Sequence, residues 1–268
     1  MTEADAANRD GAPALVFLHG WTMDGSAFAD ITERLRDRFT CLAPDLPGHG
    51  TAVDLRPDIE SAADHVHALL ESRDIGRAVL IGWSMGAAVA WRLIALHGTG
   101  LLAGLVTVDM SPKLVNEGGW TLGLTGQTPR TIAANIARFE RDWAGSAGAI
   151  AAGMFATRKG PAGFGFRQAA ARIAANDPVA MNAMWACLVA MDERKTVPKV
   201  DVPWLVMCGE RSRVYPEAAA DWLVAHAPDA RKLRFAHSGH SPHLEEPDAF
   251  AGAIARFADR VGARRTVA

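Results

Sequence analysis

The chain has 268 residues, of which 49% are hydrophobic and 22% are charged, and its formal net charge is −2 with a pI near 6.5. This length allows one large hydrophobic core together with a modest insertion. The nearly balanced charge, with basic residues scattered apart from an Arg264-Arg265 pair, excludes a general attraction for nucleic acid or anionic lipid. No apolar run is long enough to span a membrane. We therefore expect neither nucleic acid nor a membrane as a partner.

The start of the chain and the cysteines indicate where the protein works. Residues 1–13 are polar, acidic and rich in glycine and alanine, without the apolar stretch of a signal peptide. Cys41 and Cys208 lie in strand-like segments and Cys187 in a helix-like one, which favours buried free thiols over disulfides. No cysteine and histidine cluster has the spacing of metal ligands. We expect a cytoplasmic protein without a metal or cofactor, and its oligomeric state stays open.

Apolar runs and helical stretches alternate along most of the chain. Strands are predicted at about 14–18, 39–43, 78–82, 104–109, 203–208 and 231–236. Helices are predicted at about 26–37, 59–73, 86–97, 216–226 and 247–261. This alternation predicts an α/β fold with a doubly wound, mainly parallel sheet and helices on both faces.

A long segment between the fourth and fifth predicted strands contains no convincing strand. It is rich in alanine, methionine and aromatic residues and has glycine-containing breaks. Its helices are predicted at about 128–143, 146–157, 165–175 and 178–192. We therefore predict a core domain of residues 1–111 and 199–268, with a helical cap, or lid, of residues 112–198 inserted into it.

The pentapeptide Gly82-Trp83-Ser84-Met85-Gly86 joins an apolar run to a helix-like stretch. A serine exposed at the tip of a sharp strand-to-helix turn needs small residues on both sides, where a Cβ would clash. The helix that follows directs its free N–H groups at the same point and stabilises negative charge there. The pattern alone also fits an ordinary turn, but the buried-type strand and the immediate helix favour a nucleophile elbow.

A second buried-type strand ends in His19-Gly20-Trp21, and a polar loop follows it. Such a loop can present a backbone N–H to an oxyanion. The expected pair of donors is the N–H of Trp21 and that of Met85, the residue after the candidate nucleophile. His19 is expected to hold the loop by hydrogen bonding rather than to transfer protons.

Four motifs occur in the order typical of the α/β-hydrolase fold superfamily, which the chain resembles over most of its length. They are His19-Gly20-Trp21, Asp45-Leu46-Pro47-Gly48-His49-Gly50, Gly82-Trp83-Ser84-Met85-Gly86 and Gly239-His240-Ser241-Pro242-His243-Leu244-Glu245-Glu246-Pro247. The resemblance implies that the histidine directly after the glycine, His240, is the catalytic base. His237 and His243 are then expected in the loop or at the rim of the site.

The usual acid of this family is absent from its expected place. Relatives carry an aspartate in the loop after the penultimate strand, whereas here Ser212 holds that position. A serine carries no charge near neutral pH, so another carboxylate must orient the imidazole. Glu210 is one candidate. Asp109 is favoured, because it ends the strand after the elbow helix and functional side chains gather at the carboxyl ends of parallel strands; its alternative role is to cap that strand end.

The resemblance also implies an activity. A serine at the elbow argues against the branches of the family that need an aspartate or a cysteine there. The motifs look like those of small carboxylesterases, including enzymes that act on pimeloyl methyl esters, which implies ester hydrolysis of a short or medium acyl substrate through an acyl-enzyme. A thioesterase, a lactonase or a carbon–carbon bond hydrolase would need the same triad. The missing aspartate also leaves open a catalytically silent binding protein.

Large apolar residues suggest where the substrate binds. Trp21 and Trp83 flank the reactive centre in sequence and are predicted to form walls of the pocket. Most of the large residues in the cap segment are expected to build its own core, with a few facing Ser84: Trp120, Trp143, Phe155, Phe164, Phe166, Met181, Met184, Trp185 and Met191.

Overall fold

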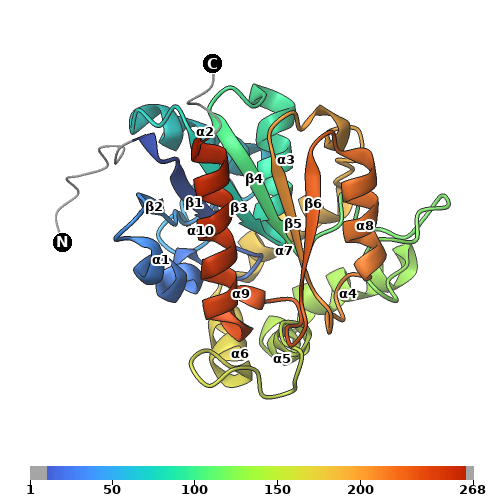
Figure 1. Cartoon of the computed structure of the whole chain (residues 1–268). Coiled ribbons are helices and arrows are strands. Elements are labelled where there is room, and N and C mark those ends of the chain that lie inside the picture. The colour runs from blue at the N-terminus through green and yellow to red at the C-terminus, as the bar shows by residue number, and fades with distance from the viewer. Residues whose placement is uncertain (1–10, 264–268) are drawn as a thin grey trace.

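The computed structural model describes residues 11–263 of the chain (Figure 1). The predictions for the first ten residues and for the Arg264-Arg265 pair lie outside the described residues. Six strands form one sheet in the order β2-β1-β3-β4-β5-β6, and every neighbouring pair is parallel. The predicted parallel α/β sheet is confirmed. The strands are β1 (Ala14–Leu18), β2 (Cys41–Leu42), β3 (Ala78–Trp83), β4 (Leu102–Val108), β5 (Trp204–Gly209) and β6 (Ala230–Phe235).

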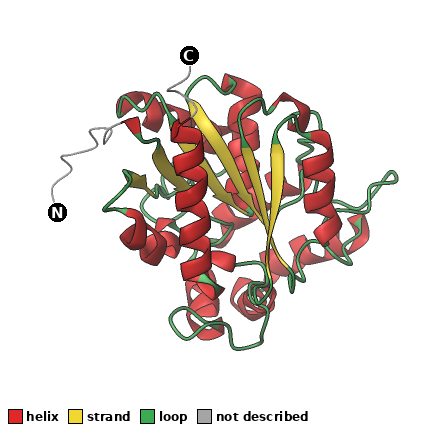
Figure 2. Cartoon of the chain, in the orientation of Figure 1, coloured by secondary structure: helices red, strands yellow, loops and turns green. Residues whose placement is uncertain are grey.

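Helices cover both faces of this sheet (Figure 2). Alternate side chains of β1 enter opposite cores, with Val16 on one side and Phe17 on the other. Both faces of β1 and β3 are buried, which explains their continuously apolar sequences. The core around Val16 includes residues of α2 (Ile59–Ser72), α3 (Met85–His97) and α8 (Glu217–His226), and that around Phe17 includes residues of α1 (Ala29–Leu35) and α10 (Pro247–Ala263).

Four helices follow β4 and precede β5, and we call them the cap. They are α4 (Pro129–Arg141), α5 (Trp143–Gly153), α6 (Phe166–Ala175) and α7 (Pro178–Ala190). Figure 1 shows α4, α5 and α6 gathered at one end of the sheet. The cap helices lie in the predicted segment, and the division of the chain into a core and a cap domain stays a prediction.

Some element boundaries differ from those predicted. The predicted helix 128–143 ends early, because Asp142 leaves the helical conformation and its side chain caps α5 at Gly145 N. The helix predicted at 26–37 begins as a 3₁₀ turn, Gly25–Phe28, before α1. The strand predicted at 39–43 pairs with β1 through two residues only. Two short helices were not predicted: α9 (Pro242–Glu245) and the 3₁₀ turn Val197–Lys199.

Within residues 11–263, none of the helices combines the length and apolar character needed to cross a membrane. All three cysteines are free. Cys208 is buried as predicted, whereas Cys41 and Cys187 are only half-buried.

Candidate active site

Ser84 sits in the sharp turn between β3 and α3. Its backbone has φ of 52° and ψ of −117°, a conformation that non-glycine residues rarely adopt and that often marks a functional site. A Cβ added to Gly82 would lie 2.4 Å from the carbonyl oxygen of Gly86, and one added to Gly86 would lie 2.0 Å from that of Leu18. The two glycines therefore allow the turn, and Ser84 becomes the N-cap of α3.

Asp109 lies beside this turn, because β4 is the neighbour of β3 in the sheet. The Ser84 N–H donates to the carbonyl oxygen of Val108 at 2.9 Å. Asp109 is buried and has a positive φ of 48°, which aspartate tolerates better than most residues. Its Oδ2 accepts a hydrogen bond from Nδ1–H of His240 at 2.6 Å. This bond leaves the other ring nitrogen of His240, Nε2, as the one that can take a proton.

Ser212 and Glu210, the residues of the loop after β5, have different partners. The Ser212 hydroxyl donates to the same Oδ2 of Asp109 at 2.6 Å and accepts from the N–H of Val214 at 3.2 Å. Glu210 is exposed and accepts from Nε–H of Arg234 at 2.9 Å. The structure thus brings Asp109 to His240 and turns Glu210 to the surface, while Ser212 supports the carboxylate of Asp109.

Trp83 holds the loop that carries His240, and the other two late histidines lie in different surroundings. Trp83 is almost fully buried, and its Nε1–H donates to the backbone oxygen of His240 at 2.7 Å. His237 is exposed as predicted. The prediction of a rim position is wrong for His243, which is 1% exposed and packs between Trp83 and Phe28. Burial, and secondarily the charge of His240, lowers the pKa of His243 to about 3.

His19 holds the loop after β1 through both ring nitrogens. Its Nδ1 donates to Gly20 O at 2.9 Å and its Nε2 accepts from the N–H of Leu46 at 2.9 Å. Burial lowers the pKa of His19, in keeping with this neutral form. His49 contributes a similar bond, because its Nε2 accepts from Thr22 N–H at 3.2 Å. These bonds agree with the expectation that His19 pins the loop.

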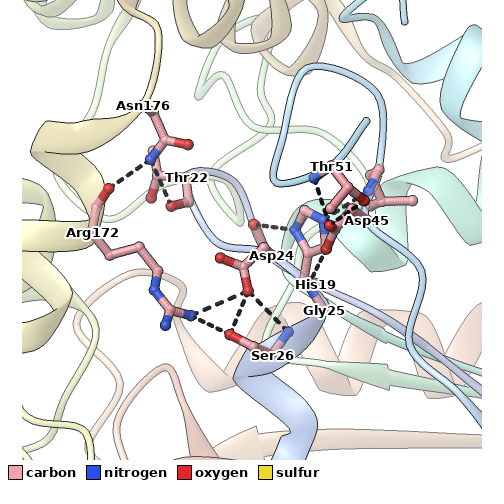
Figure 3. A network of polar contacts seen from close by, with 11 residues as sticks. His19, Thr22, Asp24, Gly25, Ser26, Asp45, Thr51, Arg172 and Asn176 are labelled. Carbon is pink, nitrogen blue, oxygen red and sulfur yellow. Dashed lines mark hydrogen bonds and ion pairs between the residues drawn. The ribbon is translucent and has the colours of Figure 1, made fainter. Parts of the chain in front are cut away.

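A polar network joins the same loop to the cap (Figure 3). Asn176, at the end of α6, donates to the carbonyl oxygen of Thr22 at 3.0 Å. Arg172 donates to Asp24 Oδ1 at 3.2 Å and to Ser26 Oγ at 2.7 Å. On the core side, Asp45 Oδ1 accepts from the N–H of Gly25, in the loop after β1, at 2.8 Å. The other oxygen of Asp45 accepts from the N–H of Thr51 at 2.7 Å. The loop with Trp21 is therefore fixed from both sides.

The backbone N–H groups of Trp21 and Met85 lie in the loop after β1 and at the first position of α3. Within the described chain, neither group donates a hydrogen bond to another backbone group. An oxyanion hole requires such N–H groups without an internal acceptor, and the assignment of these two groups to it stays a prediction.

A cavity of about 430 Å³ is lined by Ser84 and His240 together with the predicted wall residues Trp21 and Trp83. Of the nine large residues named from the cap sequence, Trp185 lines this cavity, with its ring centroid 4.6 Å from that of Trp21. Several lining residues were missed by sequence reasoning: Phe139, Ile150, Met154, Arg138, Arg213 and Tyr215. Helical spacing could have suggested the first three as inward-facing, but nothing in the sequence indicates which cap face meets Ser84.

Within residues 11–263, no group of three or more histidine, cysteine, aspartate or glutamate side chains is placed to hold a metal ion. The candidate site combines a histidine bonded to a carboxylate, a serine that lines the same cavity as that histidine, and two N–H groups without a backbone acceptor among the described residues. Such an arrangement can perform acyl transfer without a cofactor.

Comparison with known proteins assigns the chain to a family. The model of the alpha/beta hydrolase family matches residues 15–253. The chain belongs to the α/β-hydrolase family. This α/β-hydrolase is 31% identical over 240 residues to the pimeloyl-[acyl-carrier protein] methyl ester esterase of Nitrosomonas europaea, covering 89% of this chain and 92% of the relative. The protein of that name from Xanthomonas axonopodis is 30% identical over 251 residues, covering 91% and 94%. These relatives confirm the prediction of a carboxylic ester hydrolase.

Solved structures agree on the fold of this α/β-hydrolase. An esterase from Exiguobacterium antarcticum matches with a TM-score of 0.85 at 21% identity, covering 92% of both chains. The enol-lactonase from Burkholderia xenovorans matches with a TM-score of 0.77 at 21% identity, covering 92% of this chain and 91% of the other. At such low identity these likenesses show the fold alone.

Proposed function

We propose that this α/β-hydrolase cleaves the ester of a small alcohol with a short or medium acyl chain, through an acyl-enzyme on Ser84. His240 takes the Ser84 proton through Nε2, and Asp109 holds the imidazole and stabilises its charged form. The oxyanion of the tetrahedral intermediate accepts from the N–H groups of Trp21 and Met85. Water, activated by the same histidine, then releases the acid.

One observation carries this proposal: the 2.6 Å bond between His240 Nδ1 and Asp109 Oδ2, beside a serine held in a strained turn. This bond gives His240 an acidic partner although Ser212 replaces the aspartate that relatives carry after the penultimate strand. Ser212 occupies the place of that acid and donates to Asp109, so the hydrogen-bonded chain behind His240 is continuous. This continuity favours an enzyme over a catalytically silent binding protein.

We further propose a methyl ester of an acyl chain on an acyl carrier protein as the physiological substrate class. The support is the name of the relatives and the apolar part of the cavity wall, formed among others by Trp21, Phe139 and Trp185, which suits an acyl chain. The three free cysteines support the further proposal that the enzyme works in the reducing cytoplasm.

The test is a turnover screen with purified enzyme. p-Nitrophenyl esters of increasing chain length should give a burst of p-nitrophenol, and the burst should vanish in Ser84→Ala. A methyl ester should be hydrolysed faster when its acyl chain is attached to an acyl carrier protein than when it is free. Equal or faster turnover of a thioester or lactone series would contradict the ester assignment.

A further inference from the structure

Glu245 is a half-buried carboxylate in α9, five residues after His240, and no step of the proposed reaction uses it. Its Oε1 accepts from the backbone N–H of Ala156, in the segment that joins the cap helices α5 and α6, at 2.7 Å. Its Oε2 accepts from the backbone N–H of Gly239, the residue before His240, at 2.7 Å. Hydrogen bonds to a charged acceptor are about twice as strong as neutral ones. One carboxylate therefore joins the cap to the histidine loop.

The cap backbone and the histidine loop are also in direct contact at this point. A Cβ added to Gly239 would lie 2.5 Å from the nitrogen of Ala156 and 2.6 Å from the carbonyl carbon of Phe155. Only a glycine before His240 allows this approach. The segment after α5 is thus seated on the residue that leads into the candidate base.

The end of α5 has a second tie, to the loop that carries Ser212. Nη2–H groups of Arg213 donate to the carbonyl oxygens of Ala152 at 2.6 Å and Phe155 at 3.1 Å. A cation at the C-terminal end of a helix is favourable. Ile150 of α5 and Met154, the residue after it, also line the cavity, so this part of the cavity wall is attached to the loops after β5 and β6.

We propose that Glu245 is a positioning residue that couples the seating of the cap to the placement of His240. With the end of α5 in place, the carboxylate holds the N–H of Gly239 and fixes the backbone from which His240 reaches Asp109. With the cap displaced, that anchor loses its second partner and the histidine loop loosens. The inference rests on the proposed function in one respect, namely that His240 is the base.

Burial raises the pKa of Glu245 above its ordinary value, so the folded protein keeps a carboxylate where its charge is penalised. The hydrogen bonds from the N–H groups of Ala156 and Gly239 lower the pKa and so oppose this penalty.

The matched pair of variants is Glu245→Gln and Glu246→Gln. Glu246 accepts from the N–H of His237 at 3.0 Å and from Ser238 Oγ at 2.5 Å, so both of these bonds lie within the histidine loop. Glu245→Gln keeps one oxygen acceptor and turns an NH₂ group toward the other N–H. We expect it to lower kcat on a p-nitrophenyl ester about ten- to hundredfold with little change in KM, and to speed hydrogen exchange at Ala156. Glu246→Gln should leave exchange at Ala156 as in the wild type and cost less in kcat.

Glu245→Asp serves as a second variant, because it keeps the charge but is too short to bridge both N–H groups. It should also lower kcat and speed exchange at Ala156 while the melting temperature stays well above that of the assay. Wild-type kcat per active site, or unchanged exchange at Ala156, in either folded variant of Glu245 would overturn the coupling. A wild-type enzyme without turnover would instead overturn the proposed function, and exchange at Ala156 and Gly239 would still decide the coupling.

Discussion

The carboxylate of Asp109 is buried and accepts two hydrogen bonds of 2.6 Å, from His240 and from Ser212. Asp109→Asn keeps the shape but removes the charge and favours the wrong imidazole tautomer. We expect kcat on a p-nitrophenyl ester to fall by up to about 10⁴. Glu210→Gln, on the exposed side of the neighbouring loop, should leave kcat close to that of the wild type. Near-normal activity in Asp109→Asn would remove Asp109 from the mechanism.

Ser212 allows a sharper experiment, because its hydroxyl is 2.6 Å from the Asp109 oxygen that His240 contacts. A carboxylate at position 212 should therefore reach His240 once Asp109 is neutral. We expect the double variant of Asp109→Asn and Ser212→Asp to recover part of the kcat lost in Asp109→Asn. Ser212→Asp alone should lower kcat, because two carboxylates would then crowd one site. A double variant no better than Asp109→Asn would show that position 212 does not face the histidine.

The sequence predicted Ser84 and Asp109 as neighbours, because each follows a strand of a parallel sheet at its carboxyl end, and the family motif singled out His240 among three late histidines. It was insufficient for His243, which shares a motif with His240 but lies beneath it among Trp83 and Phe28. A motif gives the order of residues along a loop and not the direction of their side chains, and a polar residue gives no apolar signal of burial.

At the scale of elements, α6 supports the loop that carries one proposed oxyanion donor. Asn176 donates at 3.0 Å to the carbonyl oxygen of Thr22, which is the residue after Trp21 (Figure 3). Asn176→Asp removes this donor and places a carboxylate against a carbonyl. We expect kcat to fall about tenfold, because the Trp21 N–H moves away from the oxyanion, with a smaller effect on KM. Gln168→Glu, at an exposed amide of α6 that does not line the cavity, is the matched control. Equal losses in the two variants would argue against a specific role for the α6 tie.

The strands and most core helices follow from apolar runs and their spacing, whereas the boundary between α4 and α5 does not. Phe139, Trp143 and Ala147 continue one helical stripe across that boundary and are all buried. The break is made by Asp142, whose side chain caps Gly145 N. Periodicity cannot detect such a break, and a single aspartate is a weak signal beside an unbroken apolar stripe.

At the scale of the whole molecule, buried neutral histidines make stability depend on pH. Burial lowers the pKa of His243 to about 3, against an ordinary value of 6.5, so the unfolded chain binds more protons below pH 6.5. Stability from this group is present above pH 6.5 and is lost as pH falls toward 3. His49, whose pKa burial also lowers to about 3, acts in the same direction.

His243→Phe tests this dependence, because a phenyl ring suits the aromatic surroundings and does not titrate. The free energy of unfolding, measured with urea at pH 7.5 and pH 5, should fall by about 2 kcal/mol less in the variant than in the wild type. An identical fall in both proteins would mean that His243 is charged in the folded state.

The cavity is also a property of the whole molecule, since its wall combines residues of the cap, the elbow and the loops after β1, β5 and β6. Its existence between a cap and a sheet could be predicted from the sequence. Its lining residues could not be predicted, because they depend on how the four cap helices are positioned over the sheet. The hydrogen bonds that position these helices join residues far apart in the chain, as the bond from Arg172 to Asp24 does.

The central claim is that His240, oriented by Asp109, activates Ser84. Intact-mass measurement after exposure to a fluorophosphonate tests it most directly, because only an activated serine reacts readily with that reagent. We predict one adduct per chain, mapped to Ser84 by peptide analysis, absent in Ser84→Ala and formed far more slowly in His240→Gln and Asp109→Asn. No adduct on the folded wild type, or an adduct formed equally fast in Asp109→Asn, would contradict it.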